Sequence, residues 1–275
     1  MLTVCFIGDL VGRIGRRLVS SLVPRLREER RVHLFIANGE NAAGGFGIIP
    51  KIASALFSYG VDVITTGNHV WDKKEIIEML STDPRILRPA NYPEGTPGAG
   101  SALVRAPGGE TVGVVNICGR VYLPAIDCPF KRALGEVKKL KEKTPIVIVD
   151  AHAEATSEKM ALGYYLDGLA TAVIGTHTHV QTADERILPG GTAYITDAGM
   201  TGALDSIIGM EKEIVIHKFL TGMPVRHKVA KGRGVMCGVI LGIDPHSGRA
   251  LSVERMRIEV EPPAGGPEGE DREEE

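Results

Sequence analysis

The sequence predicts an α/β fold in which two mixed sheets pack together and are flanked by helices. Up to about Arg88, short β-rich apolar runs alternate with longer helical patterns, which is typical of βαβ units and a largely parallel sheet. After that point the pattern is richer in strands. With 43% hydrophobic residues in a chain of 275, a substantial core can be buried.

The first part of the chain contains three predicted strands and three predicted helices. The strands are expected over 2–8, 33–37 and 61–65, and the helices over 14–30, from Pro50 onward and over 72–80. Proline suits the first turn of a helix, where its missing N–H costs little. This alternation predicts a parallel arrangement for the first sheet.

The later part contains further strands around one amphipathic helical segment. Strands are expected over 102–106, 111–119 and 145–154, with the helical segment over 130–143. The last third is predicted to form consecutive antiparallel strands, over 192–196, 212–220, 234–243 and 250–260. We expect one domain over residues 1–261. Residues 262–275 hold six acidic residues and one basic residue, and are expected to form an acidic disordered tail.

Composition limits the partners and the compartment. The net charge of −2 becomes +3 without the tail, which fits an anionic substrate but gives no clustered basic stripe for nucleic acid. RNA is left open as a partner, with nothing in the sequence to indicate it, and so is a homo-oligomer. The four cysteines form no C-x-x-C pair and are expected to be reduced. The N-terminal apolar run is short, so we expect no membrane segment and a cytoplasmic protein.

Metal-ligating residue types follow five of the apolar runs. Ligands of open α/β sheets collect beyond the carboxyl ends of the strands, so these positions are the ones to compare. The residues in question are Asp9, Glu40, Asn41, Asn68, His69, His152, His177 and His179. Their coincidence predicts a shared site.

Each of these residues also has a purely structural interpretation. Asp9 suits a helix N-cap, Glu40 and Asn41 a turn, and Asn68 and His69 an Asx turn. His152 lies two residues after Asp150 and could be a hydrogen-bonded core histidine.

Taken together, these residues favour a metal site, because clustered carboxylates and imidazoles need a cation to hold them. Alternation along an extended chain would put His177 and His179 on one side, with Thr178 pointing away.

The number of candidate ligands exceeds what one tetrahedral ion accepts and indicates two ions. Two ions about 3.5 to 4 Å apart are the usual arrangement for phosphoryl chemistry. Other motifs do not fit: GDLVGRIG lacks the dinucleotide-binding spacing, GGFG lacks the lysine of a phosphate-binding loop, and no G-x-S-x-G is present.

The ordered motifs GDLVG, NGEN, GNHVWDK, DAHAE and GTHTH resemble those of the calcineurin-like metallophosphoesterase superfamily. Three positions depart from its usual pattern: Val11 replaces a histidine, Glu40 replaces an aspartate, and Thr176 replaces a histidine. With NGENAAGGFG, GTHTHVQTADE and TDAGMTGALDSIIGM, the chain resembles the YmdB branch, a cyclic-nucleotide phosphodiesterase family. This resemblance implies the sandwich fold of the superfamily.

The resemblance also implies a role for each residue. It assigns one metal to Asp9, Glu40, Asn41 and His179, and the other to Glu40, Asn68, His152 and His177, so that Glu40 bridges. His69 would be the acid that protonates the leaving oxygen. Relatives often orient this histidine with a following carboxylate, whereas Val70 follows here, so Asp72 or a backbone carbonyl is expected to take that role.

The predicted function is a dinuclear metal-dependent phosphodiesterase that hydrolyses a small cyclic nucleotide, a 2′,3′-cyclic phosphodiester, through a metal-bridging hydroxide. The mixed N and O ligands accept divalent or trivalent ions, and the resemblance favours iron or manganese over zinc. Two alternatives stay open: a phosphomonoesterase acting on nucleotides or phosphoproteins, and a metal-binding regulatory protein with little turnover.

Overall fold

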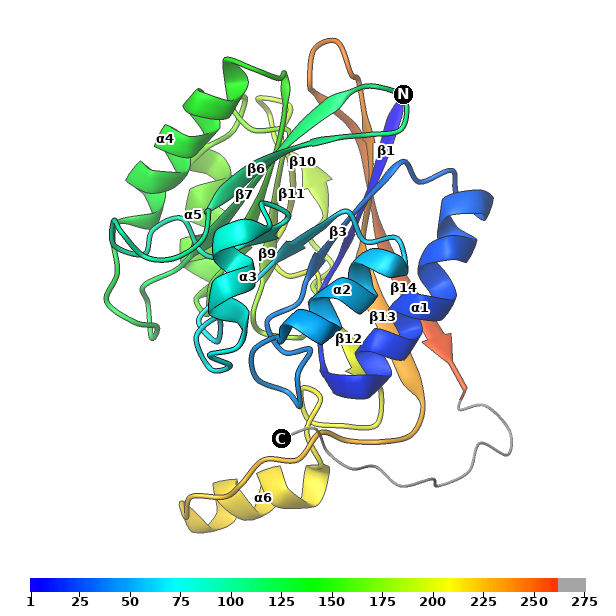
Figure 1. Cartoon of the computed structure of the whole chain (residues 1–275), viewed down its shortest axis with the longest axis vertical. Helices are drawn as coiled ribbons and strands as arrows, with labels where there is room; N and C mark the ends of the chain where they lie inside the picture. The colour runs from blue at the N-terminus through cyan, green and yellow to red at the C-terminus, as the bar shows by residue number, and fades with distance from the viewer. Residues whose placement is uncertain (262–275) are drawn as a thin grey trace.

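Two sheets lie face to face in the computed structural model, which describes residues 1–261 (Figure 1). Both are mixed: β1 pairs in parallel with β3 and antiparallel with β13, whereas β7 pairs in parallel with β8 and antiparallel with β6. The larger sheet contains, in spatial order, β2 (Asp9–Leu10), β12 (Met200–Ala203), β13 (Gly234–Ile243), β1 (Leu2–Ile7), β3 (Leu34–Asn38), β4 (Val63–Thr65) and β5 (Ile86–Leu87), with β14 (Ala250–Val260) beside β13. The smaller sheet contains β10 (Arg186–Ile187), β11 (Ala193–Ile195), β9 (Ala172–Thr176), β8 (Ile146–His152), β7 (Thr111–Cys118) and β6 (Ser101–Arg105).

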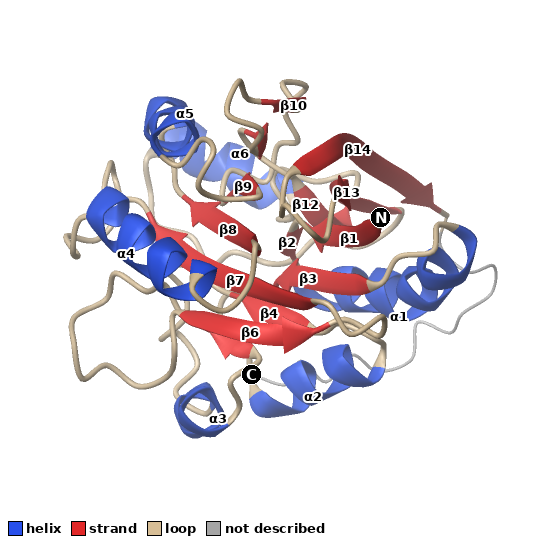
Figure 2. Ribbon diagram, turned by 90° about the horizontal axis from the view of Figure 1, so that it is seen from above, coloured by secondary structure: helices blue, strands red, loops and turns tan. Residues whose placement is uncertain are grey.

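Helices cover the outer faces of both sheets (Figure 2). Packed against the larger sheet are α1 (Gly12–Glu29), α2 (Pro50–Ser58) and α3 (Ile76–Thr82). Packed against the smaller sheet are α4 (Pro129–Lys141) and α5 (Thr156–Tyr165). The predicted class, two mixed sheets packed together and flanked by helices, is confirmed.

Strand alternation builds the layers. In β1, Leu2, Val4 and Phe6 point into the core between the two sheets, whereas Cys5 and Ile7 point toward the helices. All five are nearly or fully buried, which is why the run contains no polar alternation. Burial on both faces therefore explains the continuous apolar runs seen in the sequence.

The predicted strands of the last third are partly wrong. Residues 212–221 form a helix, α6 (Lys212–Thr221), that ends at Gly222 in the left-handed conformation and lies apart from the two sheets (Figure 1). The strand at 193–195 is parallel to β9 and not antiparallel. Only β13 and β14 form the expected antiparallel pair.

The remaining predictions have mixed outcomes. Cys5, Cys118, Cys128 and Cys237 are all free thiols, and all but Cys128 are buried. Within residues 1–261, none of the helices combines the length and apolarity needed to cross a bilayer. The acidic tail, 262–275, lies outside the described residues, and the domain boundary at 261 stays a prediction.

Candidate metal centre and active site

Polar residues from both sheets meet at one edge of the sandwich. Glu40 and Asn68 follow β3 and β4, His152 ends β8, and His177 follows β9. These strands run in parallel within their own sheets, so their carboxyl ends open on the same side. The position of the candidate site is therefore a consequence of strand direction.

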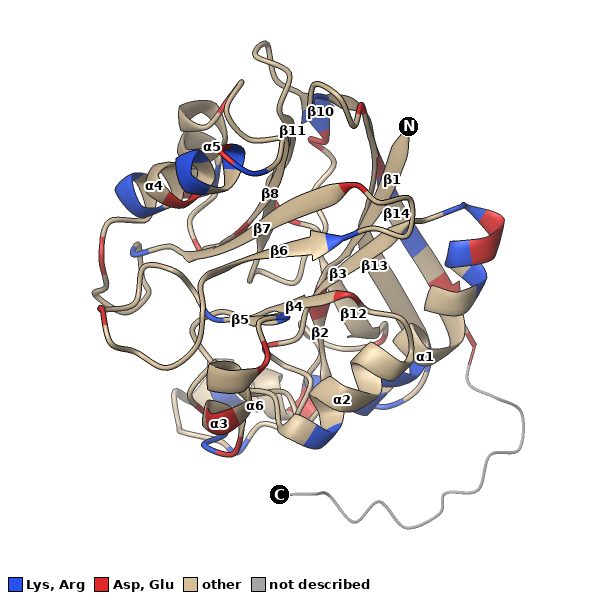
Figure 3. Cartoon of the chain, turned by 45° about the horizontal axis from the view of Figure 1, so that its top comes forward, with Lys and Arg blue, Asp and Glu red and all other residues tan. Residues whose placement is uncertain are grey.

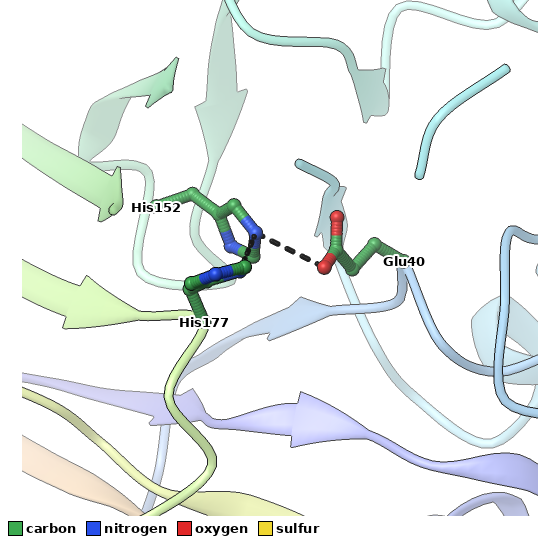
Figure 4. A group of neighbouring side chains, drawn as sticks. All are labelled: Glu40, His152 and His177. Carbon is green, nitrogen blue, oxygen red and sulfur yellow. Dashed lines mark hydrogen bonds and ion pairs between the residues drawn. The ribbon is translucent and has the colours of Figure 1, made fainter. Parts of the chain in front are cut away.

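Three donor atoms converge on the inner ring nitrogen of His152. His152 Nε2 lies 3.0 Å from Glu40 Oε1 and 3.0 Å from His177 Nδ1 (Figure 4). Asn68 Oδ1 lies 3.1 Å from the same nitrogen. Candidate ligand atoms of Glu40, His152 and His177 all lie within 4.8 Å of one another. We call Glu40, Asn68, His152 and His177 the donor cluster. The structure thus brings together the four residues expected to bind one of the two ions, and their role as ligands stays a prediction.

The outer nitrogen of His152 is held by a buried hydrogen-bond chain. The Thr176 hydroxyl donates to Asp150 Oδ1 at 2.6 Å, so its oxygen accepts from His152 Nδ1 at 2.9 Å. Asp150 also accepts from Thr65 at 2.5 Å and from Asn38 at 3.0 Å. The outer nitrogen therefore carries the proton, and Nε2 is the atom free to bind a cation.

The other two histidines are held in the same way. His177 Nε2 lies 3.0 Å from Glu154, and His179 Nδ1 donates to the Ile208 carbonyl at 2.8 Å. Their remaining nitrogens face inward, toward His152 and toward Asn41. His152 Nε2 and His177 Nδ1 face each other at 3.0 Å, and either a proton on His152 or a shared cation satisfies this pair of nitrogens.

The route by which His177 and His179 reach the site differs from the predicted one. β9 ends at Thr176, and both histidines have positive φ, 96° and 65°, so neither belongs to an extended chain. Such values are uncommon for non-glycine residues and need support from their surroundings. Asp197 provides it, because it accepts from the Thr178 N–H and hydroxyl and pairs with buried Lys159 at 2.8 Å.

Asp9, Asn41 and His179 lie beside the donor cluster as a second group. Asn41 Nδ2 lies 3.4 Å from Glu40 Oε1 and 3.1 Å from His179 Nε2. Asp9 accepts from the His177 N–H through Oδ2, while its buried Oδ1 has no hydrogen-bond partner among the described residues. A fully buried carboxylate oxygen without a donor is costly in a native protein, and it is the kind of atom that a cation satisfies.

The charges of the cluster favour a cation at His152. Burial opposes charge on this ring, yet Glu40 and Asp9 raise the pKa of His152 to about 9. Burial also opposes charge on Glu40, but its interaction with His152 lowers the pKa of Glu40 to about 2. Burial and repulsion by His152 lower the pKa of His177 to about 3. Burial raises the pKa of Asp9 to about 7. The cluster therefore favours a positive charge at this position, and a metal ion that displaces the proton can supply it.

Gly67 allows the chain to approach the cluster. A Cβ atom at this position would overlap Glu40 Oε2 and the His152 ring. No other residue type can therefore bring Asn68 to its place between β4 and the cluster.

His69 lies next to the donor cluster, but its ring contacts Asp72 outside the cluster. Its backbone N–H donates to Glu40 Oε2 at 3.2 Å, and its Nδ1 lies 2.9 Å from Asp72 Oδ2. The side chain is 29% exposed, so it can meet a molecule from solvent. The contact with Asp72 matches the carboxylate that was expected to orient this ring.

Some contributors were not predicted from the sequence. Glu154, Thr176, Asp197 and Lys159 support the histidines through the contacts given above. Glu154 is the only one with a local signal, because it lies two residues after His152, the spacing of a strand end. The others act across more than 15 residues.

A sandwich of two mixed sheets with a buried nitrogen and oxygen donor cluster at its edge has the metallophosphoesterase type of fold. The structure of the sulfate thiohydrolase SoxB from Thermus thermophilus shares this fold, with a TM-score of 0.54 and 12% identity, over 88% of this chain and 42% of SoxB. The family model described as "YmdB-like protein" matches residues 5–256. The chain belongs to the YmdB-like family, as its motifs predicted.

Three proteins resemble the chain more strongly in sequence than SoxB does. It is 51% identical to the 2′,3′-cyclic-nucleotide 2′-phosphodiesterase of Bacillus subtilis, over 93% of this chain and 96% of the relative. A crystal structure of a hypothetical protein from Thermus thermophilus superposes with a TM-score of 0.88 at 43% identity, over 95% of this chain and 100% of the other. A structure described as a novel phosphatase from Mycoplasma pneumoniae also gives 0.88, at 34% identity, over 95% of each chain.

Proposed function

We propose that this protein is a metal-dependent phosphodiesterase that hydrolyses 2′,3′-cyclic nucleotides at the 2′ ester. The observation that carries the proposal is the convergence of three donor atoms on His152 Nε2, in a chain 51% identical to a phosphodiesterase of that specificity. Asp9 Oδ1 lies beside this cluster and accepts no hydrogen bond from the described residues, which supports a second cation position.

We assign one ion to the donor cluster and a second to Asp9, Asn41 and His179, with Glu40 shared between them. The mixture of imidazole, amide and carboxylate donors fits iron or manganese, with zinc as the alternative. Bound metal ions would supply Lewis-acid charge stabilisation at the phosphate and make a water molecule acidic enough to react.

The chain's own contribution is to hold the ester and to supply a proton. His69 lies at the exposed side of the cluster, where it can protonate the departing ribose O2′. The attacking water forms a bond to phosphorus and gives up one proton to solvent, the P–O2′ bond breaks, and O2′ takes the His69 proton, which leaves a nucleoside 3′-phosphate. Asp72 acts as a positioning residue, because its contact at 2.9 Å fixes the His69 ring.

The test is hydrolysis of 2′,3′-cyclic AMP by metal-loaded protein, compared with a phosphomonoester and with His69→Ala. We expect turnover of the diester, and a loss of about 10²- to 10⁴-fold in His69→Ala with the metal content retained. His246→Ala, an exposed histidine in the β13–β14 turn, is the matched control and should keep full activity. Turnover of only the monoester would indicate a phosphomonoesterase, and turnover of neither a regulatory metal protein.

Asp72→Asn tests the positioning role separately. We expect kcat to fall about tenfold and the alkaline limb of the pH–rate profile to move to lower pH, because His69 acts in its protonated form and an amide does not stabilise the imidazolium as a carboxylate does. An unchanged rate and an unchanged pH profile would remove Asp72 from the mechanism.

A further inference from the structure

Phe46 lies at the rim of the site, beside His69. Its ring packs edge-on against the His69 ring, with centroids 5.1 Å apart and planes at 71°. A second ring, that of His227, lies 6.4 Å away at 54°. Phe46 is only half-buried, so part of its surface faces solvent. An aromatic surface next to the proposed acid is where a nucleobase attached to the reacting ribose can stack.

The loop that carries Phe46 also carries Glu40 and Asn41. Phe46 N–H donates to the Ala43 carbonyl at 3.2 Å, and Ala43 N–H donates to the Gly47 carbonyl at 3.0 Å. Gly47 has a φ of 72°, and a Cβ there would lie 2.9 Å from Lys73 Cγ. The loop is therefore tightly folded, which holds Phe46 at a constant position relative to the donor cluster.

A basic segment, residues 224–231, returns from α6 across this loop. It contains Arg226, Lys228 and Lys231, all exposed, and no acidic residue. Backbone hydrogen bonds from Glu211 N–H to Lys228 O and from Ala230 N–H to Gly209 O hold the segment in place. A Cβ at Gly45 would lie 3.0 Å from Val229 Cγ2, which puts the segment directly against the Phe46 loop.

The basic segment offers more positive charge than a cyclic mononucleotide can use. A cyclic mononucleotide carries one phosphate, and the metal site would hold it. Lys228 makes no ion pair with any residue in the described part of the chain. Recognition of a single strand uses two components: aromatic rings that stack on the bases and cations that bind the phosphate backbone. Both components lie side by side here.

We propose that Phe46 stacks on the base of the reacting nucleotide and that the basic segment binds the nucleotides on its 5′ side, so that the preferred substrate is a single-stranded RNA fragment ending in a 2′,3′-cyclic phosphate. This inference rests on the proposed function. The reaction is unchanged: water adds to phosphorus and gives up one proton to solvent, the P–O2′ bond breaks, O2′ takes the His69 proton, and the fragment keeps a 3′-phosphate.

The first test compares kcat/KM for 2′,3′-cyclic AMP and for a synthetic tetranucleotide ending in a 2′,3′-cyclic phosphate. We expect the tetranucleotide to be preferred about tenfold at low salt, with the preference falling between about 50 and 200 mM salt as phosphate contacts weaken. The double variant Arg226→Ala/Lys228→Ala should lose that preference. Lys138→Ala/Lys139→Ala, on the separate basic helix α4 (Figure 3), removes the same charge and should keep it.

The second test isolates the base platform. Phe46→Ala should reduce about tenfold the preference for 2′,3′-cyclic AMP over the base-free methyl riboside 2′,3′-cyclic phosphate. Phe46→Tyr should restore it. Phe219→Ala, at an 82% exposed position on α6, is the matched control and should have no effect.

Two outcomes separate this inference from the proposed function. Turnover of cyclic AMP with no preference for the tetranucleotide, and no change in Arg226→Ala/Lys228→Ala, would overturn the inference and leave the function standing. Absence of turnover with every cyclic ester would overturn the proposed function itself.

Discussion

Two buried aspartates at the strand ends have opposite surroundings. Asp150 and Asp9 are both fully buried, and burial raises the pKa of each carboxyl group. Asp150 accepts hydrogen bonds from Thr65, Thr176 and Asn38, whereas Asp9 Oδ1 accepts no hydrogen bond from the described residues and has only a 3.8 Å contact with His152 Nδ1. A carboxylate that supports the fold is thus fully hydrogen-bonded, and the one proposed to hold a metal keeps an oxygen open.

The closed network and the open cluster are joined through one histidine. The Asp150 network holds His152 Nδ1 through Thr176, and this directs Nε2 into the donor cluster. Rigid hydrogen bonding on one side therefore creates an oriented ligand on the other. Changes on the open side should affect metal binding and turnover, and changes on the closed side should affect stability first.

The largest effect on turnover and metal content should come from a side chain that fills the space inside the donor cluster. Gly67→Ala would place a Cβ atom on Glu40 and the His152 ring, so we expect turnover of 2′,3′-cyclic AMP to fall at least about 10³-fold and metal content to fall with it. Activity and metal analysis would check this. Gly135→Ala in α4, where an added Cβ has open space, is the control and should keep both while stabilising the helix by about 1 kcal/mol. A fully active, metal-loaded Gly67→Ala would contradict the geometry.

The two aspartates themselves should separate stability from binding. In chelator, Asp150→Asn should lower the free energy of unfolding by about 2 to 3 kcal/mol, because an amide cannot accept all three donors. Asp9→Asn should leave it unchanged or raise it, since a poorly solvated charge is removed. Denaturant unfolding measures both. Equal losses of stability would mean that the difference between the two sites has no energetic consequence.

A smaller effect is expected where the two regions meet. Thr176→Val removes the acceptor of His152 Nδ1, so we expect metal affinity to fall about 10- to 100-fold through a misoriented ring. Unfolding free energy should fall by about 1 kcal/mol. Metal titration with a competing chelator provides the measurement, and wild-type affinity in this variant would show that His152 needs no such support.

The smallest effect should come from a satisfied carboxylate further out. Burial opposes charge on Asp184, but hydrogen bonds from Thr182 and Thr196 lower its pKa below the ordinary value. Because this pKa is lowered in the folded state, the ionised carboxylate stabilises the fold above about pH 4. This stabilisation is lost as the pH falls through the folded-state pKa. Asp184→Asn should therefore flatten the acid limb of the stability profile slightly, with turnover at neutral pH unchanged. Thermal unfolding between about pH 3 and 6 would show whether the limb persists.

The sequence was sufficient to predict which residues lie together in the candidate site, because strand ends are local features. Glu40, Asn68, His152 and His177 each follow an apolar run, and parallel pairing brings those ends together. The backbone at His177 and His179 was not predictable in this way, since its left-handed conformation depends on Asp197, which is distant in sequence.

The helix α6 shows where periodicity misled the prediction. Ile214, Val215 and Ile216 form a β-branched run typical of a strand, yet only Val215 is buried and the segment has no sheet to join. Gly222, in the left-handed conformation after the last turn, is the local signal of a helix end. The closed network around Asp150 was also missed, because its partners come from separate strands.

The central claim is a two-ion site shared through Glu40, and metal content per chain tests it most directly. Elemental analysis of the purified protein should give two ions per chain, and Asp9→Asn should keep only the ion of the donor cluster, with turnover of 2′,3′-cyclic AMP strongly reduced. A protein that hydrolyses this ester at full rate with one ion or none would contradict the account.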